Sequence, residues 1–251
     1  AVFYGVGAYS YAIVATRSGA PTMWALLLAV AAAVPACIVL GWILTRLRKD
    51  DMVIGSIALQ ICFSSILLNF TSLTRGPFGI PGIPALVSIS GNPVLPYAVG
   101  LTALAVLCGV IVKSLPERYL GLALRSARDS DRFAQSLGLR VESLRLAAIL
   151  AAAVVCVLFG AAYASYAGYV DPSAFSLQES IVVYTIVLVA GSRAGGALLG
   201  VIVFVMLPEA LRFLGSTVDH ADQLRLAAVG FVLLSMPFVE GAMKQWPGER
   251  P

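Results

Sequence analysis

The stretch MWALLLAVAAAVPACIVLGWIL, residues 23–44, contains no charged residue. It lies within a longer uncharged run, residues 18–45, and a helix needs about 20 mostly apolar residues to cross a bilayer. Trp24 and Trp42 stand near its two ends, and tryptophan is enriched at membrane interfaces. The stretch therefore predicts a transmembrane helix.

Other apolar runs predict an all-α, polytopic bundle of about seven membrane helices in this chain. A span is placed at about 93–113 because the preceding GPFGIPGIP is too rich in Gly and Pro for a helix. Residues 180–208 are read as two short helices or a re-entrant element, interrupted by GSRAGG. The remaining expected spans are 52–74, 146–170, 226–239 and a partial one at 1–16. Because the chain begins at Ala1 inside an apolar stretch, we expect it to be N-terminally truncated.

The composition indicates that apolar side chains face membrane lipid as well as the protein core. The chain has 251 residues, of which 59% are hydrophobic and 12% charged, with a mean hydropathy of +0.91. Soluble domains average roughly 45–50% apolar and about 25% charged residues. The four cysteines lie in apolar runs and the chain has one histidine, so we expect free thiols and no metal site. The net charge of +4 is attributed to basic residues that set the orientation of the chain in the membrane, and no nucleic-acid partner is expected.

The basic residues are distributed unequally between the two sides of the predicted membrane. If the loop at 45–51 is cytoplasmic, strict alternation of the spans places thirteen of the seventeen Lys and Arg residues on that side. These are Arg46, Arg48, Lys49, Lys113, Arg118, Arg125, Arg128, Arg132, Arg140, Arg145, Arg193, Lys244 and Arg250. The other side has Arg17, Arg75, Arg212 and Arg225. The positive-inside rule thus predicts a cytoplasmic C-terminus.

The sequence shows no arrangement typical of a membrane enzyme. It has no HExxH, no Walker GxxxxGK[ST] and no GxSxG in a suitable context, and His220 lies in a predicted outer loop. We therefore expect no catalytic residues. Runs 18–45, 52–74 and 146–170 contain no ionisable residue of the kind that couples transport to ions, which weakens a secondary-transporter reading without excluding it.

The longest predicted cytoplasmic loop, about 114–145, contains two helical patterns. In the first, the apolar residues Leu120, Ala123, Leu124 and Ala127 recur at helical spacing. The second begins at an N-cap, Asp129 or Ser130, and ends before Gly138, where a C′ glycine belongs. Its apolar residues Phe133, Ala134 and Leu137 are predicted to share one side. This face either docks in a groove of a partner or packs on the protein's own helices or the lipid surface.

Four segments, in this order, resemble the permease subunits of ATP-binding-cassette (ABC) importers for branched-chain amino acids, the M-type subunit most closely. They are AVFYGVGAYSYAIVAT (1–16), LNFTSLTRGPFGIPGIP (68–84), GLALRSARDSDRFAQSLGL (121–139) and YASYAGYVDPSAFSLQESI (163–181). The segments AGSRAGG (190–196) and MPFVEGAMKQWPGER (236–250) depart from the family's patterns. Urea and short-amide importers share these permease motifs.

The resemblance implies a single transmembrane permease domain over residues 1–251 in a bacterial inner membrane, forming half of a translocation path. It implies four kinds of partner: membrane lipid, a second permease subunit, two cytoplasmic ABC ATPases and a periplasmic or lipid-anchored binding protein. ATP and Mg²⁺ would be used by the ATPases, and no cofactor is expected on this chain. A secondary transporter or facilitator for a small polar solute such as urea or amides remains the alternative. By position, the ATPase-coupling residues would be Asp131, Arg132, Phe133, Ala134, Leu137 and Gly138.

Small and polar residues within the predicted spans are candidates for the translocation path, because they let helices or a ligand approach closely. They are Gly5, Gly7, Tyr9, Ser10, Gln60, Ser64, Ser65 and Asn69, with Gly76, Gly79 and Gly82 forming an outer mouth. The alternative explanation is helix packing or loop shape alone for the glycines, and hydrogen bonds to carbonyls of their own helix for the serines.

Overall fold

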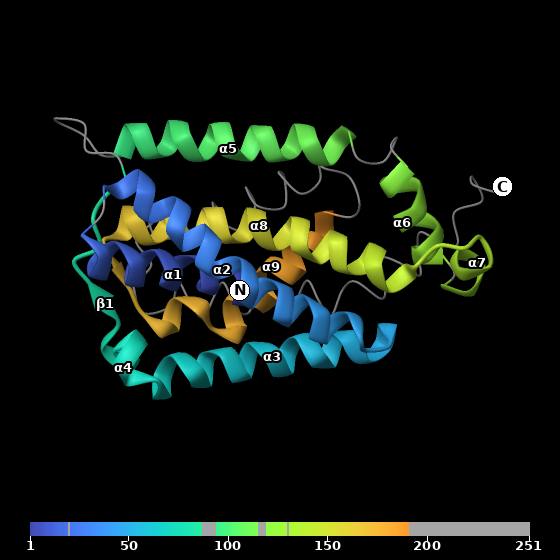
Figure 1. The fold of residues 1–251 in the computed structure, drawn as a ribbon, viewed down its shortest axis with the longest axis horizontal. Helices are drawn as coiled ribbons and strands as arrows, with labels where there is room; N and C mark the ends of the chain where they lie inside the picture. The colour runs from blue at the N-terminus through green and yellow to red at the C-terminus, as the bar shows by residue number, and fades with distance from the viewer. Residues whose placement is uncertain (20, 87–93, 115–118, 130, 191–251) are drawn as a thin grey trace, which may run out of the picture. The chain divides into compact units, whose positions relative to one another are not determined.

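The computed structural model describes residues 1–19, 21–86, 94–114, 119–129 and 131–190, and in these ranges the chain is mainly α-helical (Figure 1). The longer helices are α1 (Val2–Ser18), α2 (Thr22–Thr45), α3 (Lys49–Asn69), α5 (Val94–Ser114), α8 (Val141–Ala167) and α9 (Leu177–Ala190). The shorter elements are α4 (Thr71–Thr74), η1 (Gly76–Phe78), β1 (Ile80–Pro81), α6 (Tyr119–Asp129), α7 (Asp131–Ser136), β2 (Tyr169–Val170) and η2 (Pro172–Phe175). The predicted all-α class is confirmed.

Three described helices are long and apolar enough to cross a membrane: Thr22–Thr45, Asp51–Asn69 and Val141–Ala167. Shorter apolar helices cover Leu95–Ile111 and Leu177–Val187. The expected span at 52–74 ends early, because the helix stops at Asn69 and Phe70 leaves the helical conformation before the short α4. The runs 194–208 and 226–239, and with them Arg193, lie outside the described residues, so the number of seven stays a prediction.

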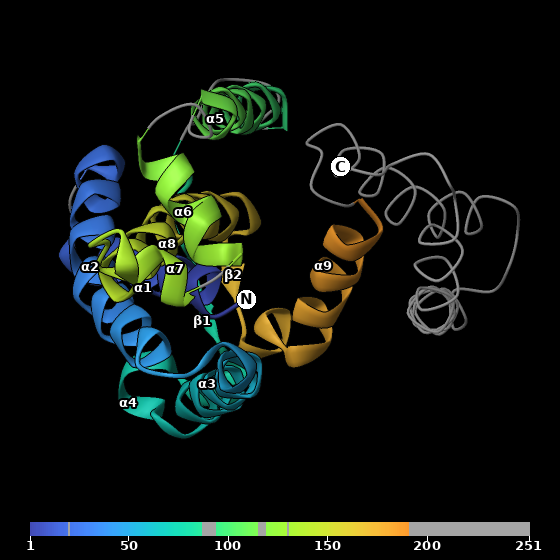
Figure 2. The same ribbon diagram turned by 90° about the vertical axis from the view of Figure 1, so that its right-hand side faces the viewer.

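Residues up to Leu177 form one compact unit, and a second unit begins at Gln178. In the first unit α1 packs against α8, α2 and α3, as the views in Figures 1 and 2 show. The buried residues at these crossings are mostly small, so the helix backbones approach closely. They include Ala8, Ala12 and Ala15 of α1, Ala25, Ala29 and Ala33 of α2, and Ala153, Ala161 and Ala164 of α8.

The outward faces of the long helices are apolar, as expected for helices surrounded by lipid. Leu27 and Val39 of α2 and Ile54 of α3 are each more than half exposed. Trp24 and Trp42, near the two ends of α2, are exposed as well, and the Arg46 guanidinium lies 5.1 Å from the centre of the Trp42 ring. The chain is thus a multi-pass helical membrane protein.

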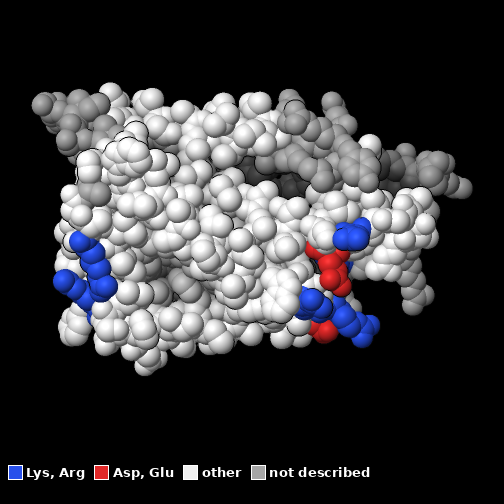
Figure 3. All heavy atoms as spheres, in the orientation of Figure 1, with Lys and Arg blue, Asp and Glu red and all other residues white. Residues whose placement is uncertain are grey.

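Charged residues lie at the ends of the long helices. At one end Arg17 donates a hydrogen bond to the Ser72 carbonyl (2.9 Å), which brings α1 to α4, and Arg75 follows α4 directly. Arg46 and Arg48 lie at the opposite end of α2. Figure 3 shows an uncharged band between two groups of charged side chains on the face in view. This band is the surface expected in contact with lipid hydrocarbon.

Candidate functional site

The predicted cytoplasmic loop folds into a small knob made of α6, α7 and the start of α8. Ala127 of α6, Ala134 of α7 and Val141 of α8 form one buried cluster, against which Leu139 packs. After α7, Gly138 has a φ of +77° and donates to the Gln135 carbonyl, while the Leu139 amide donates to the Ala134 carbonyl (3.1 Å). This is the C-terminal turn that the C′ glycine predicted.

Ala134 and Leu137 do not share one environment, although their spacing predicted a common apolar side. Ala134 is fully buried inside the knob, whereas Leu137 is 59% exposed. Leu122 of α6 is 58% exposed. Asp131, Arg132 and Phe133 lie in α7, and their side chains are outside the part that the structure describes. For Ala134 the packing alternative therefore holds, and the described apolar residues left for a partner are Leu122 and Leu137.

The predicted outer mouth is a short, ordered turn at the other end of the bundle. Gly76, Gly79 and Gly82 all have positive φ angles. Ile80 and Pro81 of β1 pair antiparallel with Val170 and Tyr169 of β2, respectively. The Tyr169 hydroxyl also donates to the Phe78 carbonyl (3.1 Å). These bonds fix the loop after α3 against the end of α8.

Gly5 and Gly7, predicted to line the path, lie at helix crossings. A Cβ on Gly7 would overlap the backbone of Val157 in α8, and one on Gly160 of α8 would overlap the Tyr4 carbonyl of α1. A Cβ on Gly5 would lie 2.6 Å from the Phe63 ring of α3. The two glycines thus have a packing role, which was the alternative explanation for them.

The polar path candidates have different surroundings. Gln60 is 3% exposed and donates to the Phe175 carbonyl, tying α3 to η2, whereas exposed Asn69 donates to the Ser65 carbonyl of its own helix. Ser10 is half-buried on α1. Tyr9 is 4% exposed, and its buried hydroxyl has no hydrogen-bond partner in the described part of the chain.

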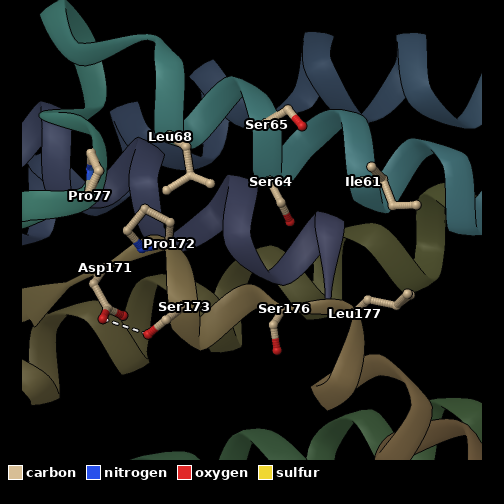
Figure 4. A pocket seen from close by; sticks show the side chains of 10 residues that line it. All are labelled: Ile61, Ser64, Ser65, Leu68, Pro77, Asp171, Pro172, Ser173, Ser176 and Leu177. Atoms are coloured by element: carbon tan, nitrogen blue, oxygen red, sulfur yellow. Dashed lines mark hydrogen bonds between the residues drawn. The ribbon is translucent and has the colours of Figure 1, made fainter.

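Ser64 lies in a cavity of about 480 Å³ between α3 and the segment from Asp171 to Leu177 (Figure 4). Its hydroxyl is directed into the gap between these two elements. The cavity has mixed chemistry, and the remaining lining residues are Ile61, Ser65, Leu68, Pro77, Pro172, Ser173 and Ser176. A pocket of this size, mainly apolar with a few polar groups, suits a small amphiphilic molecule.

Sequence reasoning did not assign Asp171, Ser173 or Ser176 to a site. Asp171 follows β2 and is the N-cap of η2, and this Asp-Pro-Ser pattern in an otherwise apolar region is the local signal that could have marked it. A second missed feature joins α5 to α8, because Tyr97 and Ser165 share a buried hydroxyl contact. In the described ranges, no three His, Cys, Asp or Glu side chains lie close enough together to hold a metal ion.

Comparisons with known proteins agree with this architecture. The family model for the permease component of the branched-chain amino acid transport system matches residues 1–236. The high-affinity branched-chain amino acid transport system permease protein LivM of Escherichia coli (strain K12) is 28% identical over 261 positions, and that of Salmonella typhimurium is 27% identical. Each alignment covers 93% of this chain and 60% of the relative, so the chain spans less than two thirds of their length. No solved structure matches the chain. The match over residues 1–236 shows that the chain belongs to the family of branched-chain amino acid transport system permease components.

Proposed function

We propose that this chain is a membrane-spanning permease subunit of an ABC importer and forms half of the translocation path for branched-chain, hydrophobic amino acids. The observation that carries the proposal is the family match over residues 1–236. The names of both relatives specify branched-chain amino acid transport, and we extend that substrate class to this chain. In this role the chain has no catalytic residue and no cofactor.

The proposed assembly contains a second permease subunit, two cytoplasmic ATPases that use ATP and Mg²⁺, and a periplasmic or lipid-anchored binding protein. It lies in a bacterial inner membrane, with the C-terminus of this chain in the cytoplasm. The position and surface of the knob support a contact with an ATPase. It follows α5 and leads directly into α8, and Leu122 and Leu137 expose apolar surface there.

Movement of the knob has a direct route to the membrane part of the protein. The knob is continuous with α8 through the buried Val141, and α8 packs along α1. A differential binding energy of about 5.5 kcal/mol is enough to move a two-state equilibrium from 1:99 to 99:1. We therefore propose that closure of the ATPase pair moves α8 through this knob.

Uptake by the reconstituted assembly tests the function. Proteoliposomes containing both permeases, the ATPases and the binding protein should accumulate leucine only with ATP, and Leu137→Glu should reduce uptake at least about tenfold, a cost of about 1.4 kcal/mol. Gln135→Glu is the matched control, because it places the same side chain at an exposed position two residues earlier, in α7, and should leave uptake near wild-type. Leucine transport by this chain alone, without ATPases, would favour the facilitator alternative and contradict the proposal.

A further inference from the structure

An apolar groove of about 190 Å³ lies between α2 and α8. Cys37 and Val157 are buried and form its floor, whereas Val34, Ile38 and Val154 are exposed at its rim among the described residues. Apart from the Cys37 thiol, its lining side chains are all aliphatic. A groove of this chemistry on a membrane helix pair suits a lipid acyl chain, although an apolar surface alone does not distinguish one lipid from another.

The two helices run antiparallel along the groove (Figure 1). Val30, in the N-terminal half of α2, lines it together with Val157 in the C-terminal half of α8. Further along α2, a Cβ on Gly41 would lie 3.2 Å from the Leu146 side chain, near the start of α8. The groove therefore leads towards the end of the bundle where α2 ends at Thr45 and α8 begins.

The α2 wall of the groove continues to a cation. Val34, Ile38, Trp42 and Arg46 recur at every fourth residue, and such residues form one ridge on a helix. Trp42 and Arg46 are both exposed, and the Arg46 guanidinium lies 5.1 Å from the centre of the Trp42 ring. Tryptophan and arginine in this order are typical of the interface between lipid hydrocarbon and headgroups.

The distance from Arg46 to the groove fits one phospholipid. At 1.5 Å per residue, Ile38 lies about 12 Å and Val30 about 24 Å from Arg46 along the helix. Half of a bilayer, including its headgroup region, is about 20–22 Å thick. A lipid with its phosphate at Arg46 would therefore place the distal part of an acyl chain in the groove.

The α8 wall adds donors at the same end. Ser143 is exposed and precedes Leu150 and Val154 by seven and eleven residues, so the three share one face of the helix. No described side chain caps the N-terminus of α8, which follows Arg140. The first amides of a helix carry partial positive charge and attract phosphate, which supports a phosphate between Arg46 and Ser143.

The charge at this end favours an anionic headgroup. The exposed basic side chains described around the ends of α2 and α8 and the start of α3 are Arg46, Arg48 and Arg140, and the exposed acidic ones are Asp51 and Glu142. The balance is positive. A zwitterionic headgroup brings its own cation to this surface, whereas an anionic headgroup does not.

We propose that this groove is a binding site for an anionic phospholipid, with the phosphate at Arg46 and Ser143 and one acyl chain along Ile38 and Val154. Arginine binds phosphate through charge-assisted, often bidentate hydrogen bonds, which provide the selectivity that the apolar groove lacks. The bound lipid fastens α2 to α8, the helix that leads from the knob into the bundle. This site lies beyond the proposed function and does not depend on the transported substrate.

The first test compares headgroups. Native mass spectrometry of the purified protein in detergent measures its affinity for phosphatidylglycerol and for phosphatidylcholine with the same acyl chains. The wild-type protein should bind phosphatidylglycerol at least about fivefold more tightly. Arg46→Gln should abolish this preference and Arg46→Lys should keep most of it. Arg75→Gln is the matched control, because it removes the same charge at the opposite end of the bundle and should leave the preference unchanged.

The second test fills the groove. Val34→Phe adds an aromatic ring at the rim and should weaken phosphatidylglycerol binding several-fold. Val39→Phe is the matched control, because Val39 is an exposed valine of the same helix that does not line the groove. The melting temperature of each variant in phosphatidylcholine should equal that of the wild-type protein, which shows that the fold is kept.

Four results would each overturn the proposal. Equal wild-type affinity for the two lipids would exclude headgroup selection, and equal losses in Arg46→Gln and Arg75→Gln would show only general electrostatic attraction. Wild-type binding by Val34→Phe would place the acyl chain outside the groove. Competition by glycerol 3-phosphate, which has the phosphate but no acyl chain, would assign Arg46 to a soluble anion.

Discussion

Gly7 and Gly160 make reciprocal contacts where α1 crosses α8. Each glycine lies against backbone of the other helix, Val157 for Gly7 and Tyr4 for Gly160. Backbone cannot rotate away as a side chain can, so neither position has room for a Cβ. Close helix approach of this kind supplies van der Waals contact in a membrane, where lipid tails compete with apolar side chains.

Gly7→Ala should therefore destabilise the protein, by about 1–3 kcal/mol for an overpacked contact. The measurement is the melting temperature of the detergent-purified protein. Gly100→Ala on α5 is the control, because no atom of the described residues outside its own helix backbone lies within 4 Å of a Cβ there, and alanine in a helix interior should be neutral or stabilising. Equal melting temperatures for both variants would contradict the close α1–α8 contact.

Gln60 offers a second test at the residue scale. Its buried side chain donates to the Phe175 carbonyl, so Gln60→Leu should leave that acceptor without this donor, at a cost of about 1–3 kcal/mol. Asn69→Leu is the matched control on the same helix, since Asn69 is exposed and bonds only its own helix. Its effect should stay within about 0.5 kcal/mol, measured by the same thermal unfolding.

At the scale of elements, the turn from η1 through β1 to Gly82 is held by its pairing with β2. Gly79 and Gly82 both have positive φ angles, but only Gly79 is crowded. A Cβ at Gly79 would overlap the Val170 carbonyl, whereas apart from its chain neighbours no described residue lies within 4 Å of one at Gly82. Gly82→Ala therefore reports the cost of a positive φ without crowding, whereas Gly79→Ala adds crowding and a backbone conformation (φ 64°, ψ −176°) that essentially only glycine adopts.

Both alanine variants should lose stability from the positive φ, about 1–2 kcal/mol for Gly82→Ala and more for Gly79→Ala. Crowding should cost Gly79→Ala about 1–3 kcal/mol of stability in addition, because the β1–β2 pairing must open to admit the methyl group. Limited proteolysis compares the two variants. Cleavage in this turn is followed over time as the loss of intact protein by mass spectrometry. Equal cleavage rates would show that the turn is not pressed against β2.

The knob shows why element packing was only partly predictable. Its two helices and Gly138 could be read from capping residues and apolar spacing, which are local signals. Helical spacing alone does not say which apolar residue meets its own chain, and in the structure Ala134 is buried while Leu137 is exposed. That difference arises from contact with Val141 at the start of α8, after the turn.

For the whole molecule, the spans were predictable because an uncharged run of sufficient length has few alternatives to a membrane helix. The end of α3 at Asn69 was missed, since residues 70–74 are uncharged and continue the run. The candidate site was harder, because Ser64 and Asp171 meet only when α3 packs beside η2. No local pattern encodes a contact between residues so distant in sequence, such as Gly7 with Val157.

The orientation of the molecule in the membrane is the remaining prediction from charge. The α4 end has Arg17 and Arg75, whereas the opposite end has Arg46, Arg48 and Lys49 between α2 and α3 and Arg140 before α8. Because positive residues are retained on the cytoplasmic side, the α4 end should face outward. Ser72 and Gln135, both exposed, report on the outer turn and on the knob, respectively.

Single cysteines at these two positions, in a variant with Cys37, Cys62, Cys108 and Cys156 replaced by alanine or serine, test this orientation. A membrane-impermeant maleimide added to intact spheroplasts should label Ser72→Cys and leave Gln135→Cys unlabelled. After permeabilisation both should react, which controls for accessibility of the thiol itself. Labelling of Gln135→Cys in intact spheroplasts would place the knob outside, where no ATP-driven partner could act on it, and would contradict both the orientation and the proposed coupling through α8.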